Sequence, residues 1–226
     1  MYIMPFDPRL DAPRAASKKP VGAPDPMDPV RRSILDAASK AFAEKGYAAT
    51  RIATIAELAG LPKSNVHYYF KSKENIYAKV LEDIAPAYLS ACMPALEDDE
   101  TPIEALTRTL IDMIRLFERQ PFASKVFMAE LREGARRLPG EFFSRWTAQT
   151  QKSLAGIRQW VDRGLLAPMD PEHALLTIWA MAQSCVSRGW QLPGLRGEAM
   201  DYDAAVRNAA RLMLRGLMPG ETSALR

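Results

Sequence analysis

Hydrophobic and polar residues alternate with a helical period along most of this chain, beginning at residue 28. Asp28 can cap a helix whose first residue is Pro29, and Gly46 is suited to end it. The apolar positions in between recur every three or four residues, as Ile34, Leu35, Ala38, Ala41 and Phe42. This spacing predicts an amphipathic helix with one buried face.

Besides a helix around residue 66 that is described below, two further helices are predicted before residue 90. A short one covers about 51–59 with Thr50 as its N-cap, and a longer one runs from about Lys73 to Tyr88. Pro86 should kink or end the longer helix, because proline lacks the N–H that a helix interior uses. The inner face of the longer helix consists of Ile76, Tyr77, Val80, Leu81 and Ile84.

The second half of the chain continues the helical pattern after the acidic link EDDE at 97–100. Thr101-Pro102-Ile103-Glu104 has the form of a capping box with proline at the first helical position, and Asp170-Pro171 opens a later helix. Helices are predicted at about 102–119, 122–133, 141–164, 171–188 and 202–217. Since no convincing run of alternating strand residues appears, the predicted fold class is all-α.

The stretch IAELAGLPKSNVHYYF, residues 55–70, has the spacing of a helix-turn-helix. Gly60 lies where the chain must leave the first helix, a position that favours positive φ. In the second helix, Val66 and Phe70 are four residues apart and anchor it to the core, with Tyr69 beside them. The residues that fall on one outward stripe are Ser64, His67, Tyr68 and Lys71.

This stripe has the chemistry of a DNA-reading helix. Phenol hydroxyls and lysines can reach phosphates, and Lys73 opens the next helix, where free backbone N–H groups also favour an anion. The start of a recognition helix usually meets the base edges. The candidates for base contact are therefore Lys63, Ser64, Asn65 and His67.

Charge supports the same conclusion. The whole chain has a net charge of +3, whereas residues 45–73 hold five basic residues against the single acid Glu57, which gives +4. The five are Lys45, Arg51, Lys63, Lys71 and Lys73. Such a local excess favours an anionic partner, the alternative being a stable helical hairpin with solvated lysines.

At these residues the chain resembles the TetR-type transcriptional regulators. The match runs through GYAATRIATIAELAGLPKSNVHYYFKSKENIYAKVL, residues 46–81. The resemblance implies an obligate homodimer without enzymatic activity, and a C-terminal helical domain that binds a small ligand and releases DNA. By position it implies phosphate contacts by Thr50, Tyr68, Tyr69 and Lys73. Two departures are Pro62, where the family usually has a capping serine or threonine, and His67, where tyrosine or leucine is common.

A second resemblance covers GIRQWVDRGLLAPMDPEHALLTIWAMAQ, residues 156–183, which is similar to the pyrimidine-utilisation repressor branch of that family (the RutR type). Trp179 and Gln183 are four residues apart and should point the same way, so an indole face and an amide could hold uracil or thymine. Phe127 and Trp146 are further candidates for the pocket lining. The alternative is that all four are core residues.

A dimer interface is expected from the last two helices. Ala174–Ser187 contains no charge and is apolar nearly all round, which is typical of a helix buried on several sides. The final helix has one apolar stripe, formed by Tyr202, Ala205, Val206, Ala209, Leu212, Met213, Gly216 and Leu217. Two such helices from each subunit can form a four-helix interface, the alternative being a purely intramolecular core.

The expected organisation follows from these patterns. Residues 1–27 hold six of the seventeen prolines and should be a disordered arm, and 219–226 a flexible tail. Between them we expect a three-helix DNA-binding domain at 28–72 and a helical ligand-binding and dimerisation domain at 73–218. No secretory signal or membrane-spanning run is found, so the expected location is the cytoplasm.

The leading hypothesis is a homodimeric repressor that binds double-stranded operator DNA, responds to a small-molecule effector and uses no cofactor or metal. Cys92 and Cys185 lack nearby histidine ligands and should be small core side chains. A regulator of efflux or lipid metabolism with an apolar effector is the alternative within the same class. An enzyme for phosphorylated substrates and a helical interaction module are rivals from other classes, and the first lacks a phosphate loop or a nucleophile–base pair.

Overall fold

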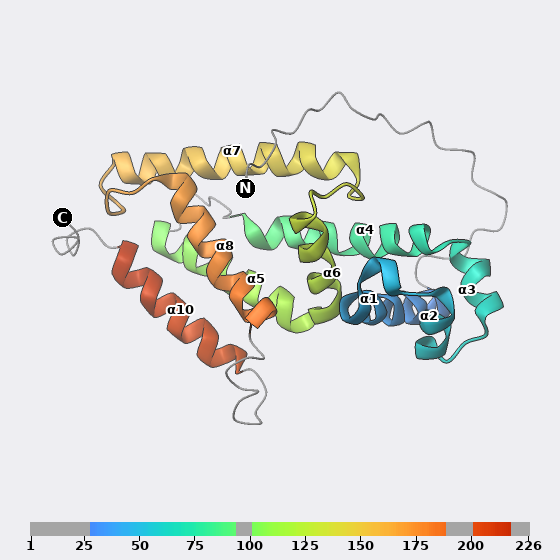
Figure 1. The fold of residues 1–226 in the computed structure, drawn as a ribbon. Helices are drawn as coiled ribbons and strands as arrows, with labels where there is room; N and C mark the ends of the chain where they lie inside the picture. Colours follow the sequence, from blue (N-terminus) through green and yellow to red (C-terminus); the bar gives the residue numbers. More distant parts are fainter. Residues whose placement is uncertain (1–27, 94–100, 189–200, 218–226) are drawn as a thin grey trace.

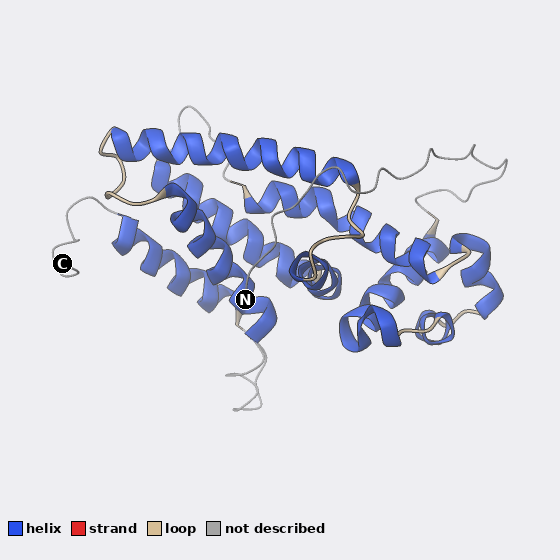
Figure 2. Ribbon diagram, turned by 45° about the horizontal axis from the view of Figure 1, so that its top comes forward, coloured by secondary structure: helices blue, strands red, loops and turns tan. Residues whose placement is uncertain are grey.

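The computed structural model describes residues 28–93, 101–188 and 201–217, which form helices and loops without a strand (Figure 2). The all-α class is confirmed. The arm at 1–27, the acidic link at 97–100 and the tail at 219–226 lie outside the described residues. The helices are α1 (Pro29–Ala49), α2 (Ile52–Ala59), α3 (Lys63–Phe70), α4 (Lys73–Cys92), α5 (Pro102–Arg119), α6 (Pro121–Arg132), α7 (Gly140–Asp162), α8 (Pro171–Arg188) and α10 (Tyr202–Leu217).

The helices divide into a small end and a larger body (Figure 1). Helices α1, α2 and α3 gather at one end of the molecule, which we call the headpiece, and α4 runs from it into the body. Within the body, α5 packs against α4, α8 and α10, while α6 packs against α1 and α4. The headpiece therefore meets the body through two helices, α4 and α6.

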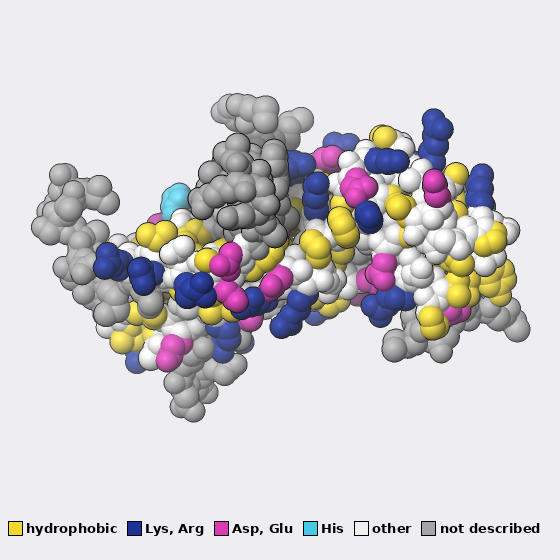
Figure 3. Space-filling model, turned by 90° about the horizontal axis from the view of Figure 1, so that it is seen from below, with side chains coloured by type: hydrophobic (Ala, Val, Ile, Leu, Met, Phe, Trp, Pro, Cys, Tyr) yellow, Lys and Arg dark blue, Asp and Glu magenta, His cyan; other side chains and the backbone are white. Residues whose placement is uncertain are grey.

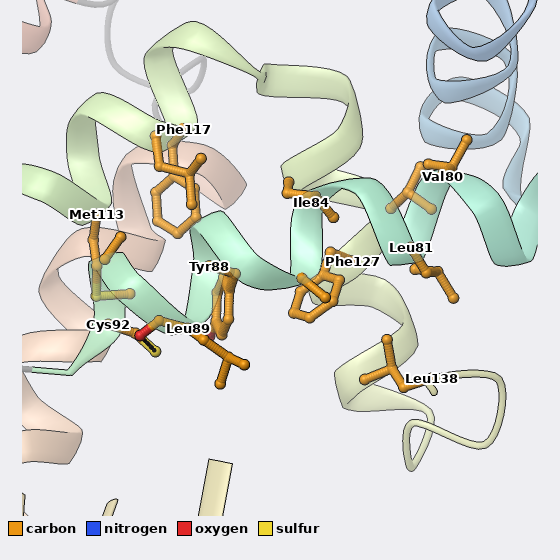
Figure 4. Close-up of a cluster of buried hydrophobic side chains, with 14 of the residues drawn as sticks. Val80, Leu81, Ile84, Tyr88, Leu89, Cys92, Met113, Phe117, Phe127 and Leu138 are labelled. Atoms are coloured by element: carbon orange, nitrogen blue, oxygen red, sulfur yellow. Dashed lines mark hydrogen bonds between the residues drawn. The ribbon is translucent and has the colours of Figure 1, made fainter. Parts of the chain in front are cut away.

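The centre of the body forms around α4 (Figure 4). Leu81, Ile84 and Tyr88 on α4 are buried, as are Phe117 of α5 and Phe127 of α6. Fully burying each large side chain of this kind contributes roughly 1.5–3 kcal/mol. Cys92 is buried as well, which confirms its prediction as a core residue.

Several helix ends form as their sequences predict. The Asp28 side chain accepts a 2.8 Å hydrogen bond from the Val30 N–H, and Thr101 and Glu104 form the reciprocal capping box. Gly60 ends α2 with φ of 65°, and Gly46 interrupts α1 with φ of 75°. Both glycines have positive φ, which residues with a side chain adopt only with strain, and Gly60 has the left-handed helical conformation.

Two local predictions differ from the structure, the first of them in part. Pro86 does not end α4, which continues to Cys92, because Ala85, Tyr88 and Leu89 around it are buried and hold the helix in place. Thr50 is not the N-cap of α2; Arg51 occupies that position and makes no capping bond with its side chain. The Thr50 side chain turns inward to α1 instead.

No helix in the described ranges is both long enough and apolar enough to cross a bilayer. Within the same ranges, no group of three or more His, Cys, Asp or Glu side chains is arranged to hold a metal ion.

Candidate nucleic-acid interface and effector pocket

The turn between α2 and α3 is held by backbone hydrogen bonds. The Leu61 N–H donates to the Ala56 carbonyl at 3.0 Å, and the Asn65 N–H donates to the Pro62 carbonyl at 3.0 Å. Pro62 stands at the N-cap of α3 and supplies no side-chain cap. Val66 is fully buried, so α3 is anchored to the core by the face that the sequence predicted.

The opposite face of α3 is exposed. Tyr68 is the extreme case, with 68% of its surface open to solvent. Lysine and arginine side chains project at this end of the molecule (Figure 3). The exposed residues of the helix and its ends are Lys63, Ser64, His67, Tyr68 and Lys71, with Asn65 partly exposed and Arg51 exposed nearby. Hydroxyl, ammonium and imidazole groups are thus arrayed on one surface, where each can donate to phosphate or a base edge.

The C-terminal end of α3 has an unusual backbone that the sequence did not predict. Lys71 adopts φ of 61°, a conformation uncommon for a residue with a side chain, and its N–H donates to the His67 carbonyl at 3.0 Å. The His67 ring atom Nδ1 lies 3.2 Å from the Lys71 carbonyl oxygen. When Nδ1 carries the proton of a neutral ring, Nε2 is left as an acceptor facing solvent.

Three residues that the resemblance implied as phosphate contacts direct their side chains into the protein. The Thr50 hydroxyl is buried and lies within hydrogen-bond distance of the Ala41 and Gly46 carbonyls, at 3.1 and 2.7 Å. The Tyr69 hydroxyl donates to Asp28 Oδ2 at 2.6 Å, and this bond lowers the pKa of Asp28. In this arrangement Thr50 can contact DNA only through its backbone. The Tyr69 hydrogen bond connects α3 to the residue before α1.

Lys73 is the third of these residues. Its ammonium donates to the carbonyls of Tyr47, Ala48 and Thr50, at 2.9, 3.3 and 3.1 Å. These carbonyls belong to the last turn of α1 and the residue after it, where helix carbonyls lack partners and a cation is favourable. Lys73 thus joins the N-terminus of α4 to the end of α1, a role that spacing in the sequence could not reveal.

Tyr47 is the residue that sequence reasoning missed at this junction. Lys73 Nζ and Arg137 Cζ each lie 4.5 Å from the centre of its ring, and its hydroxyl donates to Glu74 at 2.8 Å. Its ring also meets Tyr77 with the ring centres 4.7 Å apart. The only sequence signal was the aromatic residue directly after Gly46.

Glu130 of α6 is a buried carboxylate, 1% exposed, next to this cluster. It accepts hydrogen bonds from the Tyr77 hydroxyl at 3.0 Å and from the Arg137 backbone N–H at 2.8 Å, and it pairs with the Arg137 guanidinium at 3.4 Å. Burial, and then the bond to Glu130, raise the pKa of Tyr77. The network links α4 to α6 and the loop that follows it.

The four predicted pocket residues lie in one aromatic cluster in the body. The Trp146 and Trp179 ring centres are 5.1 Å apart, and Tyr88 bridges Trp146 and Phe127 at 5.9 and 4.7 Å. Phe127 is fully buried, whereas both tryptophans keep some exposure. The structure therefore brings these residues together around Tyr88, which the sequence analysis had not singled out.

Both polar groups of the expected pocket are bonded to α4. The Trp179 indole N–H donates to the Cys92 carbonyl at 2.6 Å. Gln183 is hydrogen bonded to the Tyr88 hydroxyl, and this contact only partly offsets the effect of burial, which raises the pKa of Tyr88. A ligand that hydrogen bonds to the Gln183 amide would compete with the Tyr88 hydroxyl of α4 for that amide.

Family descriptions match the chain in two consecutive segments. Residues 34–80 match "Bacterial regulatory proteins, tetR family", and residues 81–220 match "YcdC-like protein, C-terminal region". The chain is 33% identical over 193 residues to the HTH-type transcriptional regulator RutR of Escherichia coli K12, covering 84% of this chain and 91% of RutR. The HTH-type transcriptional repressor KstR2 of Mycolicibacterium smegmatis is 26% identical, over 76% of this chain and 85% of KstR2.

Several solved structures of transcriptional regulators have a fold similar to that of this chain. A bacterial regulatory protein of the tetR family from Rhodococcus RHA1 superposes with a TM-score of 0.67 at 22% identity, covering 86% of this chain and all of the other. PfmR, a TetR family regulator from Thermus thermophilus, superposes with a TM-score of 0.63 at 26% identity, covering 81% of this chain and 97% of PfmR. AibR in complex with isovaleryl coenzyme A and operator DNA superposes with a TM-score of 0.59 at 20% identity, covering 81% of this chain and 97% of AibR.

Proposed function

Because the chain belongs to the TetR family of bacterial transcriptional regulators, we propose that it is a homodimeric repressor released from a palindromic operator by a pyrimidine. The observation that carries the DNA-binding part is the outward face of α3. Tyr68 is largely exposed there although its ring meets the edge of Tyr69, and Lys63, Ser64 and His67 share the same surface. The proposed division is phosphate contact by Tyr68 and Lys71 and base contact from the start of the helix.

Dimerisation is proposed through α8 and α10. Leu176 of α8 is 54% exposed and Leu212 of α10 is 68% exposed, on helices that both pack their other face against α5. A second subunit that covered these leucines would complete a four-helix interface. Such a dimer would bind a palindrome when its two α3 helices lie about one DNA turn apart, ~34 Å.

A pyrimidine is proposed as the effector because the region of Trp179 and Gln183 resembles the pyrimidine-utilisation branch. The amide of Gln183 offers one donor side and one acceptor, which matches an imide edge, and Trp146 and Trp179 supply flat apolar surfaces. AibR, a structure of the same fold, has been solved with both isovaleryl coenzyme A and operator DNA. The same fold therefore accommodates a small ligand and operator DNA together.

The proposed coupling runs along α4. The Trp179 indole bonds to its last carbonyl, Gln183 contacts Tyr88 near the same end, and Lys73 at the first residue holds the end of α1. The helix has 20 residues and is about 30 Å long at 1.5 Å per residue. A pyrimidine that displaces these contacts would shift one end of α4, and the headpiece would follow at the other end. The effector must favour the released state by a few kcal/mol to act as a switch.

The effector proposal is tested by titrating the purified dimer calorimetrically with uracil and thymine. Gln183→Ala is expected to abolish the heat of binding, whereas Tyr88→Phe removes the same internal hydrogen bond but keeps the amide and should still bind. Gln159→Ala, an exposed glutamine on α7, is the control. If Tyr88→Phe loses binding as completely as Gln183→Ala, the amide does not recognise the base. If the wild type binds neither compound, the effector is not of this class.

The DNA proposal is tested separately by selecting binding sites from random duplex DNA. The selected sequences are expected to be two-fold symmetric and to lose affinity steeply with added salt. Recovery of sequences without symmetry would contradict binding by a two-fold dimer. Saturating uracil should then weaken binding to the selected site at least tenfold.

A further inference from the structure

A cleft of about 350 Å³ lies at the junction of headpiece and body, away from the aromatic cluster around Trp179. It is bounded by α1, α4 and α6, the helices that meet where the two parts join. Its volume lies at the lower end of the range for small-molecule sites. The lining residues are Phe42, Ala43, Gly46, Tyr47, Tyr77, Lys125, Val126, Met128, Ala129, Arg132 and Glu133.

The walls of the cleft are built from large rings of α1 and α4 on one side and from side chains of α6 on the other. Phe42, Tyr47 and Tyr77 pack against one another with ring centres 4.7–6.0 Å apart, and they join α1 to α4. On α6, the small side chain of Ala129 leaves the space open, and on α1 Gly46 contributes no side chain. A Cβ placed on Gly46 would meet nothing within 4 Å.

The charged groups of the cleft are mainly basic. Lys125 and Arg132 are seven residues apart and so project from the same face of α6, two turns apart. Both are exposed, and neither has an ion-pair partner among the residues that the structure describes. Glu133 is the single acid of the lining, which leaves a net charge of +1. Behind the wall, the two cations over the Tyr47 ring, Lys73 and Arg137, are balanced by the carboxylates that accept from the Tyr47 and Tyr77 hydroxyls.

We propose that this junction cleft is a second small-molecule site, which takes a singly charged organic carboxylate with a compact apolar or aromatic body. The rings and the apolar side chains of α6 would bury the body of the ligand, and Lys125 and Arg132 would pair with its carboxylate. A doubly charged anion would fit less well because Glu133 offsets one of the two cations. The ligand would touch α1 and α6 together.

Binding at this site would hold the headpiece against the body, and this consequence rests on the proposed function. A ligand that ties α1 to α6 resists any rotation of α1–α3 on which operator release depends. Occupancy of the junction would then reduce the effect of the body effector on DNA affinity. The binding itself requires neither DNA nor the pyrimidine, so the two proposals can fail independently.

Met128 lines the cleft and provides a local probe. We would label the methionine methyl groups with ¹³C in the full chain, assign the Met128 signal with Met128→Leu, and titrate with benzoate and with its neutral analogue benzamide. Benzoate is expected to shift the Met128 signal in a saturable manner while the core residue Met113 stays unchanged, and benzamide should bind at least tenfold more weakly. Equal binding of both compounds, or shifts only at other methionines, would overturn the proposal.

Variants test the assigned residues. Lys125→Gln combined with Arg132→Gln should weaken benzoate binding at least tenfold, whereas Lys152→Gln combined with Arg158→Gln, two exposed cations on α7, should leave it unchanged. Ala129→Leu should fill the cleft and abolish the Met128 shift, with near-native thermal stability as the check on folding. Undiminished binding in the Lys125 and Arg132 variant would refute the site.

Discussion

The ammonium of Lys73 lies 4.5 Å from the centre of the Tyr47 ring and donates a 2.9 Å hydrogen bond to the carbonyl of the same residue. One cation thus contacts the ring and the backbone of the residue that follows the break in α1 at Gly46. Since Lys73 also bonds to the Ala48 and Thr50 carbonyls, the first residue of α4 holds the connection between α1 and α2.

Replacing Lys73 tests whether it acts on the fold or on DNA. We expect Lys73→Met to lower the free energy of unfolding by about 1–3 kcal/mol, because three carbonyls lose a charged donor. Urea titration measures this change. A pure phosphate contact would instead leave stability unchanged and reduce the salt dependence of operator binding. Lys71→Met, at an exposed lysine two residues away, is the matched control and should show that second pattern.

The two adjacent tyrosines of α3 should behave oppositely when each loses its hydroxyl. Tyr68→Phe is expected to leave stability within about 0.5 kcal/mol of the wild type, since the side chain is exposed, and to weaken operator binding by roughly 1 kcal/mol, or about fivefold. Tyr69→Phe loses the bond to Asp28 and should mainly reduce stability. Parallel measurements of unfolding and operator affinity check both; an unchanged operator affinity in Tyr68→Phe would remove that hydroxyl from the interface.

The interface on α8 and α10 is tested by charge. Leu176→Glu and Leu212→Glu should yield folded monomers, because both leucines are exposed in the single subunit and lose nothing there. Sedimentation velocity and circular dichroism measure the two properties. Arg207→Gln on the solvated side of α10 should remain dimeric. A dimer that survives both leucine substitutions would place the interface elsewhere.

The bond between Tyr77 and Glu130 predicts sensitivity to alkaline pH. Since the folded protein raises the pKa of Tyr77, the stabilisation is fully present below the ordinary tyrosine pKa of about 10 and is lost as pH rises above it. Tyr77→Phe should lower stability at pH 8 by about 1–3 kcal/mol, because the buried Glu130 loses a donor. The urea midpoint of this variant should also fall less than that of the wild type between pH 8 and about 11. An equal fall in both proteins would show that Tyr77 does not carry this pH dependence.

The elements of the fold were accessible from the sequence because local rules govern them. Asp28, Gly60 and the Thr101–Glu104 box act within a few residues of their own position, and each forms as predicted. Pro86 does not end α4, because burial of its neighbours, a tertiary effect, outweighs the local loss of one hydrogen bond. The same limit applies to Thr50, whose inward partners lie four and nine residues earlier in the chain.

The candidate sites could be predicted only in part from the sequence. The outward stripe of α3 follows from helical period alone, and the pairing of Trp179 with Gln183 follows from their four-residue spacing. Many bonding partners at the two sites come from distant segments of the chain. Trp179 and Cys92 are 87 residues apart, and Tyr77 and Glu130 are 53 residues apart. No periodic pattern encodes such distances, so the junction of Tyr47, Lys73 and Arg137 was visible only in three dimensions.

The continuity of α4 limits how the protein can be recombined with its relatives. Its first residue fastens the end of α1, while Ile84 and Tyr88 further along belong to the centre of the body. In a chimaera joined between residues 72 and 73, the first turn of α4 would come from a relative and α1 from this protein. The Lys73 contacts would then be lost unless the relative had the same contacts. The smallest transferable DNA-reading module therefore includes the first half of α4, and the seam belongs inside that helix.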